Sequence, residues 1–101
     1  MTVYSVIQLT RRIKALLDGD SELCDCLVEG EVSNSTLARS GHLYFTLKDA
    51  EAELRCVMWR SQASRVQVPA QGEWVRARGY VSVYERGGAY QFYAAELTTD
   101  G

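Results

Sequence analysis

Aromatic and basic side chains recur at alternate positions between residues 42 and 60, where they could bind a ligand. A flat aromatic ring can stack on a nucleobase, and a guanidinium group can hold a phosphate. The residues of this set are His42, Tyr44, Thr46, Arg55, Trp59 and Arg60. Because no nucleophile is paired with the histidine, the set favours recognition of single-stranded nucleic acid over catalysis.

The same alternation predicts two antiparallel strands, 42–48 and 53–59, joined by a turn at residues 50–52. One face of this hairpin is aliphatic and the other is aromatic and basic, so we expect it to be half-buried. The most symmetric register pairs Lys48 with Glu53 as a salt bridge, Thr46 with Arg55, Tyr44 with Val57, His42 with Trp59, Leu47 with Leu54, Phe45 with Cys56 and Leu43 with Met58. A slip of one residue would place Arg55 among leucines, so the register is strongly specified.

The rest of the chain divides into one helix and further strands. Apolar residues at three- and four-residue steps predict a helix at about 5–18, with Gly19 as a left-handed C-cap. A first strand follows at 26–33, in which Gly30 indicates a bend or a close backbone approach. The remaining segments are a polar loop at 34–41, a short helix at 60–66, a fourth strand at 73–85, a turn at 86–89 and a fifth strand at 90–97.

Five strands with a short helix between the third and fourth describe a mainly β fold, the Greek-key OB barrel, expected here over about residues 26–97. In that architecture the ligand binds around strands 2 and 3 and the loops that join strands 1–2 and 4–5. Arg39 falls in the first of these loops and Arg86 in the second. The residue pattern and the fold therefore indicate the same surface.

Length and composition predict one globular domain over residues 1–101, with 47% apolar and 24% charged residues. No apolar run approaches the roughly 20 residues that span a bilayer, so we expect no membrane association. The N-terminus does not resemble a secretory signal. Three cysteines cannot all pair within one chain, which favours free thiols and a cytoplasmic location.

The net charge of −2 argues weakly against nucleic acid, but the charges are unevenly distributed. Residues 18–31 contain six acids and no base, whereas residues 54–86 contain six arginines and only two acids. Because the local field decides where a polyanion binds, the arginine-rich part can attract a nucleic acid.

Five blocks of the sequence resemble the large subunit of exodeoxyribonuclease VII. They are residues 4–6 (Tyr-Ser-Val), 28–34 (Val-Glu-Gly-Glu-Val-Ser-Asn), 40–49 (Ser-Gly-His-Leu-Tyr-Phe-Thr-Leu-Lys-Asp), 55–63 (Arg-Cys-Val-Met-Trp-Arg-Ser-Gln-Ala) and 79–85 (Gly-Tyr-Val-Ser-Val-Tyr-Glu). The resemblance covers roughly residues 4–97, and it implies an OB domain that holds single-stranded DNA. It also implies that this domain is a fragment of a longer chain, followed by a catalytic region and completed by several copies of a small subunit.

Each functional interpretation has a structural alternative. Trp59 could be packed under the short helix, and Tyr44 could simply cover a sheet face. Arg55 and Arg60 could be surface cations paired with Glu53 or Glu51, although such pairs contribute only about 0–1 kcal/mol. The Cys24-Asp25-Cys26 run lacks the further ligands that zinc needs, and the acids Asp18, Asp20, Glu22 and Asp25 are more typical of a solvated loop than of a metal-dependent nuclease.

We therefore expect a non-catalytic domain that binds single-stranded DNA and presents it to a nuclease region outside this segment. Its expected contacts are Arg39, His42, Tyr44, Thr46, Arg55, Trp59, Arg60 and Arg86, without a metal or cofactor. The small subunit would be a partner through the parent chain, whose activity would be hydrolysis of single-stranded DNA. The alternative is a protein–protein interaction module that docks subunits or the parent catalytic region.

Overall fold

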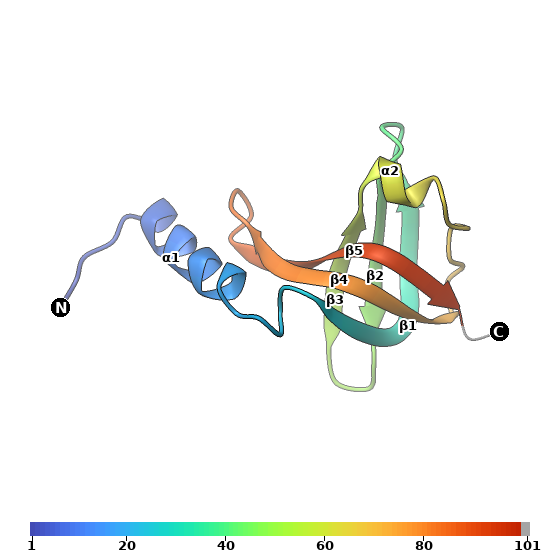
Figure 1. The fold of residues 1–101 in the computed structure, drawn as a ribbon, viewed down its shortest axis with the longest axis horizontal. Helices are drawn as coiled ribbons and strands as arrows, with labels where there is room; N and C mark the ends of the chain where they lie inside the picture. Colours follow the sequence, from blue (N-terminus) through green and yellow to red (C-terminus); the bar gives the residue numbers. More distant parts are fainter. Residues whose placement is uncertain (100–101) are drawn as a thin grey trace.

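The computed structural model describes residues 1–99 and contains five strands and two helices (Figure 1). The elements are α1 (Val6–Asp18), β1 (Cys26–Leu37), β2 (Leu43–Lys48), β3 (Glu53–Met58), α2 (Arg60–Ala63), β4 (Trp74–Tyr84) and β5 (Ala89–Thr99). The strands close into a barrel in the order β1-β2-β3-β5-β4, with β3 and β5 parallel and all other neighbours antiparallel. This arrangement confirms the predicted mainly β OB-fold barrel with an N-terminal helix and a short helix between strands 3 and 4.

The β2–β3 hairpin has the predicted register. All six pairs within the strands are observed, from Leu43 opposite Met58 to Lys48 opposite Glu53. The predicted salt bridge is wrong, however, because the Lys48 ammonium lies 3.4 Å from a carboxylate oxygen of Glu31 on β1 instead. In a barrel each strand has two neighbours. The charge on Lys48 of β2 is offset by β1, its neighbour outside the hairpin.

The barrel interior is filled by inward-facing side chains of every strand. Its buried members are Val32, Leu43, Phe45, Leu47, Cys56, Met58, Ala63, Val75, Ala77, Phe92 and Ala94. Phe45 and Phe92 are among its largest side chains, and full burial of each contributes about 1.5–3 kcal/mol. Ala63 belongs to α2, so this short helix packs against the core and the chain just before it is held in place.

Strand β1 is longer than predicted. It continues to Leu37 past a bulge between Val32 and Asn34, so part of the expected 34–41 loop is paired with β2. The extra residue at a bulge breaks the alternation, which explains why the sequence pattern ended too early. Gly30 provides the expected close approach, because a Cβ there would lie 2.9 Å from the Lys48 carbonyl oxygen.

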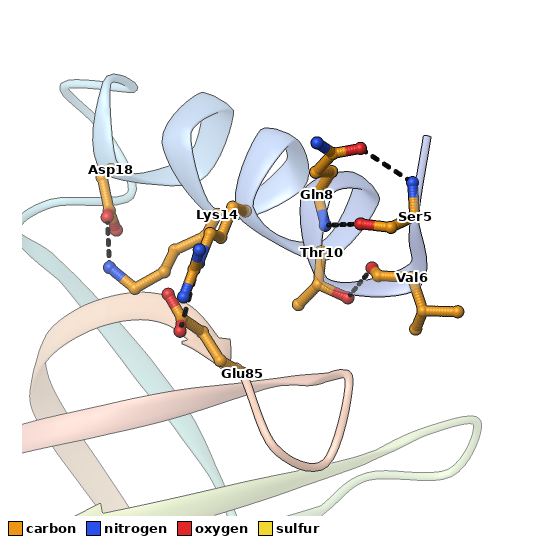
Figure 2. A network of polar contacts seen from close by, with 8 residues as sticks. Ser5, Val6, Gln8, Thr10, Lys14, Asp18 and Glu85 are labelled. Atoms are coloured by element: carbon orange, nitrogen blue, oxygen red, sulfur yellow. Dashed lines mark hydrogen bonds and ion pairs between the residues drawn. The ribbon is translucent and has the colours of Figure 1, made fainter. Parts of the chain in front are cut away.

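Helix α1 extends away from the barrel (Figure 1). Ser5 and Gln8 form a capping box at its start, with bonds of 3.2 Å and 2.9 Å between side chain and backbone (Figure 2). The predicted left-handed cap at Gly19 is wrong: its φ is −88°, and its N–H donates to the Ala15 carbonyl at 3.0 Å. The helix therefore ends by tightening in the right-handed region, which requires no positive φ.

Within residues 1–99, neither helix has the length and apolar character that crossing a bilayer requires.

Candidate nucleic-acid interface

Trp59 follows the last residue of β3 and keeps its alternation, so its ring faces outward. Its backbone is extended, with φ −67° and ψ 154°, and 41% of its surface is exposed. The ring makes edge contact with His42, at a centroid distance of 5.1 Å and an interplanar angle of 78°. The indole is thus partly exposed, which favours the functional interpretation over the structural alternative in which it is packed under α2.

His42 is fixed by the start of α2. Its Nδ1 accepts a hydrogen bond of 2.9 Å from the Arg60 backbone N–H. The stem of Arg60 lies against Gly41, which has a φ of +90°; a Cβ at Gly41 would be 2.7 Å from the Arg60 Cγ. The histidine thus orients the turn and the tryptophan ring beside it.

Two tyrosines continue the aromatic surface onto the other half of the barrel. Tyr93 of β5 lies with its centroid 5.8 Å from Trp59, and Tyr80 of β4 stacks on Tyr93 at 5.0 Å and 13°. We call the four rings of His42, Trp59, Tyr93 and Tyr80 the aromatic row. The sequence pattern assigned no role to Tyr80 or Tyr93. Only the parallel pairing of β5 with β3 brings Tyr93 beside Trp59.

The outer face of the hairpin lies next to the aromatic row. Tyr44 is 46% exposed, Thr46 is half-buried and Arg55 opposite it is exposed. Val57 lies opposite Tyr44 as predicted, but unlike Tyr44 it is only 2% exposed. In the register it lies between Tyr44 on β2 and Tyr93 on β5, and these two large neighbours explain its burial.

Four of the candidate arginines lack an acidic partner in the part of the chain that the structure describes. Within residues 1–99, no ion pair joins Arg39, Arg55, Arg60 or Arg86 to a carboxylate, so the alternative pairing of Arg55 and Arg60 with neighbouring glutamates is not observed. Such cations keep their charge available for an anionic ligand.

The arginines of β4 are neutralised, in contrast. Arg76 binds Glu29 at 2.9 Å, and Arg78 holds both carboxylate oxygens of Asp25 at 2.9 Å. The hydrogen bond from Arg78 lowers the pKa of the Asp25 carboxyl below its ordinary value. Acids of the N-terminal part thus offset charge on β4, whereas Arg55 on β3 and Arg60 on α2 form no ion pair among the described residues.

The two loop arginines do not come together. Arg39 lies in a tight turn where Ala38 donates to the His42 carbonyl at 2.9 Å, so it neighbours the aromatic row along the chain. Arg86 lies in the turn between β4 and β5, beside α1, whereas the turn between β1 and β2 lies beside α2 (Figure 1). The structure therefore places Arg86 apart from the other candidate residues.

Within residues 1–99, no group of three or more His, Cys, Asp or Glu side chains could hold a metal ion. The three cysteines are free, as the sequence predicts. The acids near residue 20 have other roles: Asp20 Oδ1 accepts from two backbone N–H groups at 3.0 and 3.1 Å, and Asp18 binds Lys14.

A family model described as an OB-fold nucleic acid binding domain matches residues 4–98. The large subunit of exodeoxyribonuclease 7 from Desulforudis audaxviator is 50% identical over 102 residues, which is 100% of this chain and 25% of that protein. The corresponding subunit from Clostridium acetobutylicum is 43% identical, over 98% of this chain and 25% of its own length. These relatives confirm the resemblance, and the chain spans about a quarter of their length.

Solved structures with low sequence identity share the fold. Asparaginyl-tRNA synthetase from Pyrococcus horikoshii has a TM-score of 0.62 at 16% identity, over 89% of this chain and 22% of that one. The S. pombe Stn1-ten1 complex gives 0.61 at 16% identity, over 74% of this chain and 57% of the other.

Proposed function

Since this chain belongs to the family of OB-fold nucleic acid binding domains, we propose that it binds single-stranded DNA and presents it to a nuclease region of an exodeoxyribonuclease VII large subunit. One observation supports this more than any other: exposed rings and unpaired arginines share one face, while the arginines of β4 are neutralised. The names of the relatives point to DNA as the substrate and to a nuclease as the enzyme.

Stacking and charge would divide the work of binding. Bases stack on Trp59 and Tyr44, and each stacked base contributes about 1–3 kcal/mol regardless of its identity. Arg55 and Arg60 offset the negative charge of the phosphates that link these bases. Because neither interaction reads the edge of a base, binding is largely independent of sequence.

The other candidate residues have supporting roles. His42 orients the Trp59 ring through its edge contact, and Thr46 lies opposite Arg55 on the neighbouring strand. Arg39 and Arg86 extend the positive field at the two ends of the path. In the parent enzyme, a cytoplasmic assembly with the small subunit would hydrolyse the strand that this domain holds.

Tryptophan fluorescence tests the proposal directly. In a Trp74→Phe variant Trp59 is the only tryptophan, and we expect oligo-dT to quench its emission as bases stack on it. A Trp59→Phe variant, which reports only Trp74, should change little. The apparent affinity should fall steeply as salt rises, because bound phosphates release counterions. Unchanged Trp59 emission at oligonucleotide concentrations up to solubility, or an affinity independent of salt, would contradict the proposal.

A protein-interaction module is the second candidate, and the apolar side of α1 favours it. No residue of α1 is buried, and Val6, Leu9 and Leu16 are 86%, 48% and 60% exposed. This surface is separate from Trp59, so binding of the parent catalytic region through it should persist in Trp59→Ala and weaken in Leu9→Ser. Loss of binding in both variants or in neither would count against a docking role for α1.

A further inference from the structure

A hollow of about 440 Å³ lies where α1 meets the outer face of β4. It is lined by Lys14, Asp18, Cys24, Tyr80, Val81, Ser82 and Tyr93. Its volume falls within the roughly 300–1,000 Å³ typical of small-ligand sites. No residue of α1 is buried, so the helix leaves this hollow open instead of filling it.

The hollow is continuous with the aromatic row. Tyr80 and Tyr93 form part of its wall, and the same Tyr93 ring lies 5.8 Å from the Trp59 ring. Tyr80 stacks on Tyr93 at an interplanar angle of 13°, so only one face of the Tyr80 ring is covered by Tyr93. A single-stranded oligonucleotide with one base stacked on Trp59 can therefore reach the hollow along a continuous aromatic surface.

The polar groups in the hollow are arranged as a neutral donor–acceptor pair. The Lys14 ammonium lies 2.6 Å from Asp18 Oδ2, and Ser82 donates to Asp18 Oδ1 at 2.7 Å (Figure 2 shows the Lys14–Asp18 contact). The hydrogen bonds from Lys14 and Ser82 lower the pKa of Asp18, so its carboxyl is ionised at neutral pH. Ser82 is only 4% exposed, which fixes the carboxylate in place.

This combination suits a nucleobase better than a phosphate. A phosphate would meet the Asp18 carboxylate, and among the residues that line the hollow the one cation, Lys14, is already paired with that carboxylate. The edge of a base, in contrast, places a donor beside an acceptor, which matches a carboxylate next to an ammonium that keeps spare N–H groups. The tyrosine wall supplies the stacking surface.

We propose that this hollow is a nucleobase-binding subsite at which Tyr80 stacks on one base and the Lys14–Asp18 pair hydrogen-bonds its edge. The proposal rests on the single-stranded DNA binding proposed above and extends its path from β3 across β5 and β4 to α1. Helix α1 then takes part in ligand binding, and a short oligonucleotide that covers only Trp59 does not occupy the subsite.

Affinity measurements with oligo-dT of increasing length test the subsite. Tyr80→Ala should weaken binding of a long oligonucleotide by about 5- to 150-fold, the loss expected for one stacked base, and weaken a short one clearly less. Tyr84→Ala is the matched control, because Tyr84 is a similarly exposed tyrosine on the same strand that does not line the hollow. Lys14→Met, a change at the surface of α1, should also weaken only the long oligonucleotide.

A chemical footprint provides a second readout that a merely structural effect would not produce. Cys24 lines the hollow and is exposed, so in a Cys26→Ser variant a long oligo-dT should slow its reaction with Ellman's reagent. A strand of abasic nucleotides of equal length should protect it less. If the domain binds long oligo-dT without protecting Cys24, and Tyr80→Ala and Lys14→Met bind it normally, the subsite is wrong while the proposed function stands. If no oligonucleotide binds, both fail.

Discussion

Trp59 shows how one side chain acquires a binding geometry from its surroundings. It lies one residue beyond β3, where the strand's alternation still turns its ring outward, and α2 begins at the next residue. The rings of His42 and Tyr93 both lie close to it, at centroid distances of 5.1 Å and 5.8 Å. Because these contacts restrict the ring before a ligand arrives, less conformational entropy is lost when a base stacks on it.

The cysteines give a prediction at the same scale. Cys24 is exposed, whereas Cys56 is 3% exposed and its burial raises the pKa of its thiol to about 12. The thiolate is the reactive form, so Ellman's reagent at pH 8 should modify Cys24 quickly and leave Cys56 intact in the folded protein. Denaturant should expose all three thiols. Modification of Cys56 at the rate of Cys24 without denaturant would contradict the barrel core described here.

At the scale of the strands, Gly79 determines how β4 and β5 fit together. The register shifts between Arg78 and Gly79, and a Cβ at Gly79 would lie only 2.0 Å from the Tyr93 carbonyl oxygen. The two backbones approach so closely that only glycine fits. The same contact holds Tyr93 beside Tyr80, so this bulge positions half of the aromatic row.

Substitution of that glycine should therefore be costly. Gly79→Ala forces the β4 or β5 backbone to move, and we expect it to lower the free energy of unfolding by about 2–4 kcal/mol in urea titrations. Gly19→Ala is the control, because its φ is −88° and the nearest atom to its Cβ would be 3.3 Å away. It should change stability by less than about 1 kcal/mol. Equal effects of the two substitutions would contradict the close approach of the β4 and β5 backbones at Gly79.

The sequence predicted those features that depend on near neighbours in the chain. Strict alternation and a short turn were enough for the β2–β3 register, and they placed Tyr44, Arg55 and Trp59 on one face. The position of Tyr93 could not be predicted in the same way, because parallel pairing of β5 with β3 joins segments more than 30 residues apart. Lys48 and Val57 differ from expectation for the same reason: each has a second neighbouring strand that the hairpin pattern does not contain.

At the scale of the whole molecule, the uneven charge has a structural consequence. The acidic N-terminal part does not simply repel anions, because Asp25 and Glu29 of this part pair with arginines of β4. Arg55 and Arg60, which form no ion pair among the described residues, lie on or next to the strand that leads to Trp59. A domain with a net charge of −2 can therefore present a positive surface to a polyanion.

The affinity of two tryptophan variants for a single-stranded oligonucleotide tests the central claim most directly. Trp59 and Trp74 are 41% and 45% exposed, but only Trp59 belongs to the aromatic row, so they form a matched pair. At fixed salt, Trp59→Ala should weaken binding of oligo-dT by about 5- to 150-fold, and Trp74→Ala should leave it within about twofold. Equal affinities for the two variants, with both folded, would contradict the assignment of this face to nucleic acid.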